Sequence, residues 1–160
     1  MSGTHFDIPA CGRAVLHALE LAKEDITRWT AGLDDSEIHA RPFGLPSVAF
    51  HLRHIARSID RLLSYAEGKQ LSGEQLAALK GEQQGSESSA ALTAEFQAAL
   101  QNAEDRIRIL ATADLEMSRG IGRKELPASL GGALIHVADH TQRHAGQVIT
   151  TSKLLLAMRA

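Results

Sequence analysis

The chain has 160 residues, of which 44% are hydrophobic and 22% charged, and its formal net charge is −2. These values predict one globular domain spanning residues 1–160, because a chain of this length can bury a core of its own. Without a basic run it is not expected to bind nucleic acid. A lone Cys11, no secretory signal and no apolar run of ~20 residues predict a cytoplasmic protein that does not bind membranes.

The first expected helix runs from about Pro9 to about Ala31, and Gly32 ends it. Apolar residues recur there at threes and fours, which indicates a face turned to a helical core: Val15, Leu19, Ala22, Ile26, Trp29 and Leu33. The polar stretch LDDSEIHARPFG follows, closed by Pro42 and Gly44, and it predicts a turn of helix and a loop.

The second expected helix begins near Pro46 and stops before Gly68. Its core stripe consists of Val48, Leu52, Ile55, Ile59, Leu62 and Leu63. His51 lies at the edge of this stripe, and His54 lies further round the helix. The solvent-facing side is predicted to carry Arg53, Arg57, Asp60 and Arg61.

Residues 68–89 lose this apolar density. Ser72 and Gln75 resemble a capping box and predict a short helix over residues 71–80. The sequence GEQQGSESS after it is polar and is predicted to be mobile. Connections within helical bundles usually take about 2–8 residues, so this longer one predicts a crossover between helices that are not hairpin neighbours.

The third long helix is expected from about Ala90 to Thr112. Residues 113–129, with two glycines and a proline, are predicted to form a loop or a short extended excursion. They lead into the last helix, which carries three histidines and continues almost to the C-terminus. No stretch shows the alternating pattern of a β-strand. Four long amphipathic helices predict an all-α, four-helix bundle with a long crossover between its second and third helices.

Three histidines, His136, His140 and His144, follow one another at intervals of four in the last helix. Side chains four residues apart on an α-helix differ in direction by only about 40°, so neighbouring pairs of these histidines lie on the same face and can bind one metal ion. His144 falls in the apolar stripe and His140 on its shoulder, whereas His136 lies towards the polar side. Burying an unsatisfied imidazole costs about 1–3 kcal/mol, so each buried ring needs either a metal or a hydroxyl or carbonyl partner.

A site built from His140, His144 and one histidine of the second helix would have three neutral ligands and an open position, as catalytic zinc sites do. A metal held in this way lowers the pKa of bound water or of a bound thiol, which suits hydrolysis or thiol transfer. A closed cysteine site is excluded by the single cysteine, and a di-iron site by the lack of inward Glu-x-x-His pairs. No carboxylate stands at motif spacing beside the histidines, so no general base can be named.

Two stretches, PSVAFHLRHIARSIDRLL and GGALIHVADHTQRHAGQVIT, resemble the DinB-like (DinB/YfiT) superfamily of four-helix-bundle metalloenzymes. The family has a histidine followed by Ile or Leu and Ala in its second helix, and H-x-x-x-H before Gly-Gln in its fourth. These positions correspond to His54, His140 and His144. The resemblance implies that these three bind zinc or nickel, that the bundle runs up-down-down-up, and that the protein forms a homodimer. Ala145 departs from the basic residue frequent before Gly-Gln, which puts in doubt any anionic contact there.

Periodicity and resemblance disagree about the second helix, since periodicity places His51 nearer the bundle axis and the resemblance selects His54. The prediction follows the resemblance, because a catalytic metal belongs at a cleft that solvent can reach. His51 is then expected to be packed, and His136 to be a cleft-wall or surface residue.

The expected function is that of a metal-dependent enzyme, either a transferase that activates a low-molecular-weight thiol or a hydrolase. Its partners would be a small-molecule substrate and a second copy of the chain. The alternative is a non-catalytic, dimeric metal-binding or stress-associated scaffold bundle.

Overall fold

The structure is a computed structural model that describes residues 4–159, and the protein is predominantly helical. Four long helices are accompanied by short helical segments and one small hairpin. The long helices are α1 (Ala10–Thr30), α3 (Val48–Ala66), α5 (Ser89–Leu110) and α6 (Leu130–Ala157). The short elements are α2 (Asp35–His39), the 3₁₀ turn η1 (Pro42–Gly44), α4 (Gly73–Gly81), β1 (Ser118–Ile121) and β2 (Leu126–Ser129). The prediction of a mostly helical protein is confirmed.

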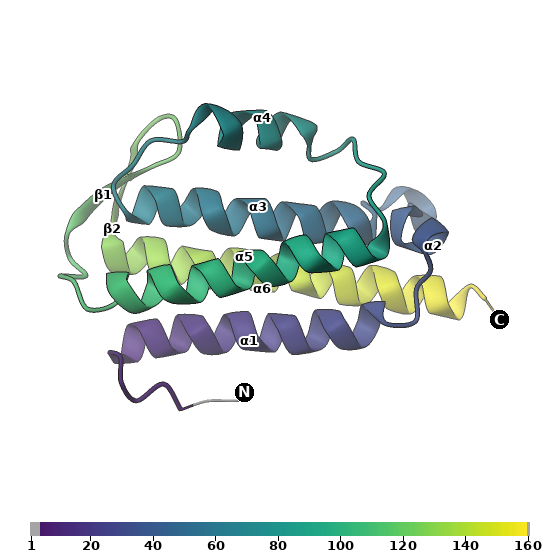
Figure 1. Ribbon diagram of the computed structural model, residues 1–160, viewed down its shortest axis with the longest axis horizontal. Helices are drawn as coiled ribbons and strands as arrows, with labels where there is room; N and C mark the ends of the chain where they lie inside the picture. The colour runs from purple at the N-terminus through teal and green to yellow at the C-terminus, as the bar shows by residue number, and fades with distance from the viewer. Residues whose placement is uncertain (1–3, 160) are drawn as a thin grey trace.

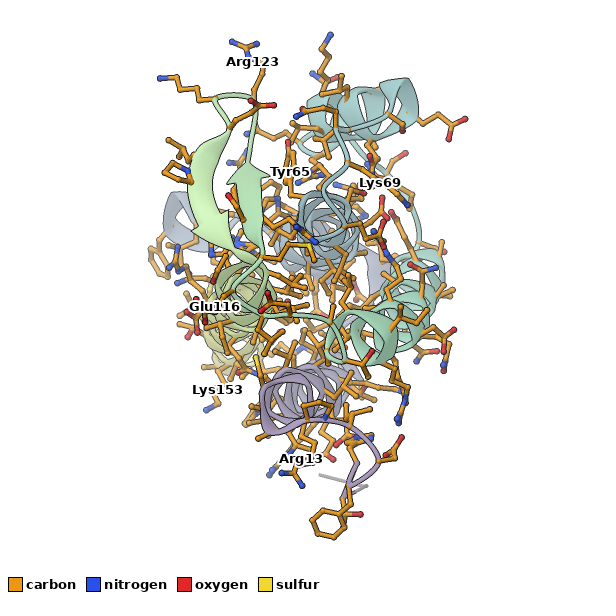
Figure 2. The ribbon with its side chains drawn as sticks, turned by 90° about the vertical axis from the view of Figure 1, so that its left-hand side faces the viewer. Arg13, Tyr65, Lys69, Glu116, Arg123 and Lys153 are labelled. Atoms are coloured by element: carbon orange, nitrogen blue, oxygen red, sulfur yellow. The ribbon has the colours of Figure 1, made fainter. Side chains whose placement is uncertain are left out.

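The four long helices lie side by side around a common apolar core (Figure 1). Helix α6 packs against both α1 and α3, and α5 packs against α3 and, less extensively, α1. The colour ramp of Figure 1 shows α3 and α5 running in one direction and α1 and α6 in the other. Seen end-on in Figure 2, side chains from all four helices fill the space between them. The largest fully buried side chains include Leu52, Ile55 and Ile59 of α3, Phe96 of α5 and Leu134 of α6.

A crossover segment (residues 67–88) joins the end of α3 to the start of α5 and carries α4 over the outer side of α3 (Figure 1). The expected capping box is confirmed, because the Ser72 hydroxyl accepts from the Gln75 backbone N–H and the Gln75 side chain accepts from the Ser72 N–H. Both bonds satisfy backbone donors that the first turn of a helix leaves unpaired.

The segment before α6 corrects the sequence analysis, which expected no strand. Strands β1 and β2 form an antiparallel hairpin that pairs Ser118 with Ser129 and Ile121 with Leu126. Neither strand has a buried face, so its four residues show no alternation of apolar and polar side chains. Gly122, with φ of +75°, makes the turn, and Arg123 points away from the helices in Figure 2. Helix α6 begins at Leu130, directly after β2, and Ser129 caps it by accepting from the Gly132 N–H.

A second correction concerns the side of α3 that was predicted to face solvent. Arg53 and Arg61 are buried, with exposed fractions of 2% and 8%. The crossover segment covers this side of α3, so its arginines lie in an interior between two parts of the chain. Among residues 4–159, no helix is both long enough and apolar enough to cross a membrane.

Candidate metal centre

Three histidines from two helices meet where α3 packs against α6. His54 of α3 and His140 and His144 of α6 each offer one ring nitrogen, and these atoms lie within 4.8 Å of one another. The Nε2 atoms of His54 and His140 are 3.1 Å apart, and the ring centroids of His140 and His144 are 4.7 Å apart. Imidazoles at this separation can hold a divalent metal ion between them.

The charge state of these rings also suits a metal. Burial, aided by the charges of neighbouring histidines and of Arg143, lowers the pKa of His140 and of His144 to about 4. Both rings are therefore neutral at neutral pH, and the neutral imidazole is the form that ligates a cation. The donor set fits a zinc- or nickel-type ion, for which imidazole is a preferred ligand.

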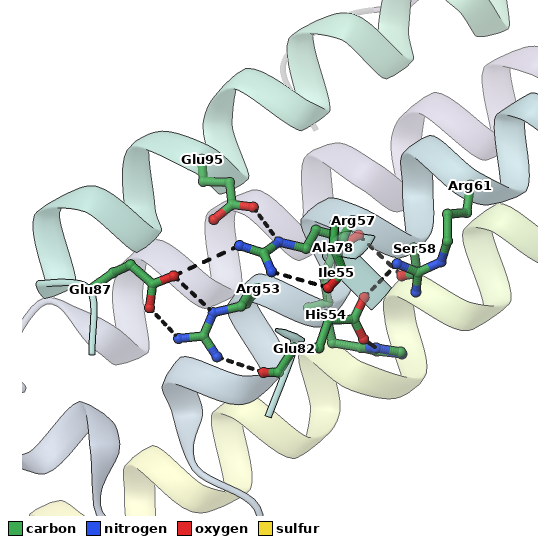
Figure 3. Close-up of polar contacts among 10 residues, drawn as sticks. All are labelled: Arg53, His54, Ile55, Arg57, Ser58, Arg61, Ala78, Glu82, Glu87 and Glu95. Atoms are coloured by element: carbon green, nitrogen blue, oxygen red, sulfur yellow. Dashed lines mark hydrogen bonds and ion pairs between the residues drawn. The ribbon is translucent and has the colours of Figure 1, made fainter. Parts of the chain in front are cut away.

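The outer nitrogen of His54, which is the Nδ1 atom facing away from His140, contacts a buried carboxylate (Figure 3). His54 Nδ1 lies 2.7 Å from Oε2 of Glu82, and Arg61 Nη1 donates to Oε1 of Glu82 at 2.5 Å. Glu82 is only 4% exposed. Burial by itself raises the pKa of this carboxyl group, but the hydrogen bonds from His54 and Arg61 outweigh burial and hold the pKa below its usual value. Glu82 is therefore an ionised acceptor for both neighbours.

Sequence reasoning missed Glu82, which lies 28 residues from His54 in a stretch predicted to be mobile. In the structure, Arg53 joins this stretch to α3. Arg53 Nη1 donates to the Glu82 carbonyl oxygen at 2.7 Å, and Nη2 donates to the Glu87 carboxylate at 2.6 Å. The available signal was three arginines at intervals of four on α3, namely 53, 57 and 61, followed by a segment rich in glutamate.

His51, the alternative ligand from α3, lies behind the group and not within it. It is 3% exposed, and its Nδ1 atom is 3.1 Å from Nδ1 of His144. Burial, aided by His144 and His54, lowers the His51 pKa to about 4. Its Nε2 atom is buried and has no hydrogen-bond partner within residues 4–159. His51 therefore packs beside a candidate ligand, as expected for a core residue.

Two further side chains border the group. His136 is exposed, and its ring centroid lies 5.8 Å from that of His140. Phe50 stacks on His54 with centroids 5.5 Å apart and an interplanar angle of 14°. Phe50 also lines a pocket of about 330 Å³, together with His39, Arg41, Pro46, Ser47, Arg53, Gln83 and Gly85. None of the three histidines of the group lines this pocket, and Phe50 is the side chain that borders both.

A second group, His5, His17 and Glu20, also places three possible ligand atoms within 4.8 Å of one another. Here the outer nitrogen of His5 meets a cation, since Arg108 Nη2 donates to His5 Nδ1 at 2.9 Å. A guanidinium has no acceptor, so Nε2 must carry the ring proton, which it donates to Glu20 Oε1 at 2.8 Å. This arrangement leaves no lone pair of His5 for a metal.

Comparison with known proteins identifies the family of the chain. No curated protein gives a significant match to it. A model of the DinB superfamily matches residues 18–148, more than half of the chain and a span that includes His54, His140 and His144. The resemblance found in the sequence is thereby confirmed, and the chain belongs to the DinB superfamily.

Proposed function

We propose that this protein is a metal-dependent enzyme in which His54, His140 and His144 bind one divalent ion, zinc or nickel. The observation that carries the proposal is the convergence of three imidazoles with no fourth histidine, cysteine or carboxylate in the group, among the residues that the structure describes. Three protein ligands leave a coordination position open, as in catalytic zinc sites. When bound, the ion supplies a Lewis acid that lowers the pKa of a thiol or water in that position.

Thiol activation suits the surroundings better than hydrolysis does. A general base for water must lie beside the open position, but the Glu82 carboxylate contacts Nδ1 of His54, whereas Nε2 of the same ring faces His140. A thiol has only to lose its proton as it binds. The proposed reaction is therefore transfer of a low-molecular-weight thiol, with hydrolysis as the second choice.

We further propose that the four long helices form an up-down-down-up bundle within one domain spanning residues 1–160. The helix pairings and the shared direction of α3 and α5 in Figure 1 support this topology. It would give α3 and α6, the two helices that carry the histidines, opposite directions and a shared face. The homodimer and the cytoplasmic location stay predictions.

Metal titration followed by thiol addition tests the proposed function. Metal-free protein should take up zinc, nickel or cobalt stoichiometrically, and 2-mercaptoethanol added to the cobalt form should produce a thiolate charge-transfer band. The His140→Ala variant is the control and should show neither effect. Failure to bind metal stoichiometrically would overturn the proposal. A cobalt spectrum that does not change when the thiol is added would exclude the transferase. A hydrolase or a non-catalytic scaffold would then be the candidate functions.

A further inference from the structure

The contact between Glu82 and His54 decides which nitrogen of His54 carries a proton. An ionised carboxylate accepts hydrogen bonds and donates none, so the 2.7 Å contact requires the proton to be on Nδ1. Nε2 of the neutral ring is then unprotonated, and it is the atom that lies 3.1 Å from His140 Nε2. His54 is held in the tautomer that a metal ligand needs, with its lone pair directed into the group.

The other two rings of the group have a different kind of contact. His140 Nε2 meets His54 Nε2, and His144 Nδ1 meets Nδ1 of His51, each at 3.1 Å. Because His54 Nε2 is unprotonated, His140 Nε2 must be the donor in the first contact of the metal-free protein, whereas in the second contact either imidazole can donate. Neither of these two rings has its tautomer set by a contact with a carboxylate. The carboxylate contact therefore singles out His54 as the preset ligand.

Two buried arginines hold Glu82 in place at both its side chain and its main chain. Arg61 donates to Oε1 and balances the carboxylate charge, while Arg53 donates to the Glu82 carbonyl oxygen and to Glu87 (Figure 3). Gly85 lets the chain pass over the Arg53 guanidinium, since a Cβ atom there would lie 2.1 Å from Nη2. The crossover segment is thus anchored at Glu82 itself and at Glu87, five residues further along the chain.

We infer that Glu82 is a positioning residue of the metal centre, which orients His54 through its Nδ1–H and is itself held by Arg61 and Arg53. The inference rests on the proposed metal centre and adds a residue of the crossover segment to it. Outer partners of metal-bound histidines fix the ring and raise its basicity, and their loss typically lowers metal affinity by about 10–100-fold.

The first test compares zinc affinity in Glu82→Gln and Glu95→Gln by competition with a chelator of known affinity. Glu95 is the matched control, because it accepts from Arg57 on the same side of α3 at 2.8 Å but lies outside the histidine group. Glu82→Gln should bind zinc about 10–100-fold more weakly, while Glu95→Gln stays within about twofold of the natural protein. Equal affinities for the two folded variants would overturn the inference.

The second test needs no metal, so it separates this inference from the proposed function. Nitrogen-15 NMR of the metal-free protein, at a mildly alkaline pH where histidine is neutral, reports which ring nitrogen carries the proton. His54 should be protonated at Nδ1 and not at Nε2, and this preference should weaken in Glu82→Gln. The opposite tautomer in the natural protein would overturn the role of Glu82. Failure to bind zinc with the expected tautomer present would overturn only the proposed function.

Discussion

The two histidine groups of this protein are alike in spacing and opposite in their surroundings. Both bring three possible ligand atoms within 4.8 Å of one another. In the first, Glu82 accepts from the outer nitrogen of His54, whereas in the second Arg108 donates to the outer nitrogen of His5. The carboxylate leaves the inner nitrogen of His54, Nε2, without a proton and able to bind a metal. The guanidinium of Arg108 requires the inner nitrogen of His5, Nε2, to carry the ring proton. Proximity of ligands is therefore insufficient, and the partner behind the ring decides which group can bind a metal.

The largest expected effect separates the two groups by removing one histidine from each. His54→Ala should abolish stoichiometric zinc binding, because two imidazoles with an open cavity hold zinc far more weakly than three. His5→Ala should leave it unchanged. Metal analysis after equilibrium dialysis checks both variants, and loss of zinc in His5→Ala alone would reverse the assignment of the two groups.

His51→Ala provides a sharper control within the first group. This residue lies beside His144 and outside the set of three, so the variant should retain stoichiometric zinc while its melting temperature falls, because a buried side chain is lost. Loss of the metal in His51→Ala and its retention in His54→Ala would contradict the assignment. Helical periodicity, which places His51 nearer the bundle axis, would then have identified the ligand correctly.

A smaller effect is expected from Gly85→Ala, which disturbs the anchor of Glu82 without touching a histidine. The new methyl group would collide with the guanidinium of Arg53 and displace the crossover segment, so zinc affinity should fall several-fold but less than in Glu82→Gln. Gly81→Ala is the control, because a Cβ atom there meets nothing within 4 Å. Equal zinc affinities in the two glycine variants would show that the segment does not support the centre.

Removal of the metal should affect stability and leave the fold intact. The apolar core is fully buried without a contribution from the histidine group, as Leu52, Phe96 and Leu134 show. Chelation should therefore lower the free energy of unfolding only by the binding linkage, about 2.7 kcal/mol at a free zinc concentration ~100 times Kd. Circular dichroism melts with and without chelator measure this, and a collapse of the helical signal would make the metal structural.

The smallest effect is expected from Arg108→Gln in the second group. Its ion pairs with Asp7 and Glu104 are exposed to solvent, so their loss should lower the stability of the protein only slightly. Zinc affinity at the first group should not change. Urea denaturation combined with the same competition titration checks both expectations, and a marked loss of zinc affinity would mean that the two groups are coupled.

The sequence predicted the long helices well because each buries a stripe of apolar residues whose spacing is visible locally. It also ranked the histidines of α3 in the order of their burial, since His51 is deeper than His54. The depth of burial did not identify which histidine of α3 belongs to the group of three, however. His51, the more deeply buried of the two, packs beside His144 and lies outside that group. The family resemblance supplied the choice of His54, and the use of the three as metal ligands stays a prediction.

What sequence reasoning missed depends on contacts between distant residues. Glu82 reaches His54 only after the crossover segment folds back on α3, and no local pattern marks a glutamate that will be buried by two arginines. Arg53 and Arg61 were assigned to solvent because charged residues opposite an apolar stripe usually face water. In this protein a second layer of chain covers that face, which periodicity within one helix cannot reveal.

X-ray absorption at the zinc edge tests the central claim most directly, because it counts the ligands of the bound ion. The zinc-loaded protein should show three imidazole nitrogens at about 2.0–2.1 Å and one further light atom, with no sulfur. After addition of 2-mercaptoethanol the light atom should be replaced by one sulfur at about 2.3 Å. A site with four protein ligands that excludes the thiol, or zinc bound without imidazole, would contradict the account.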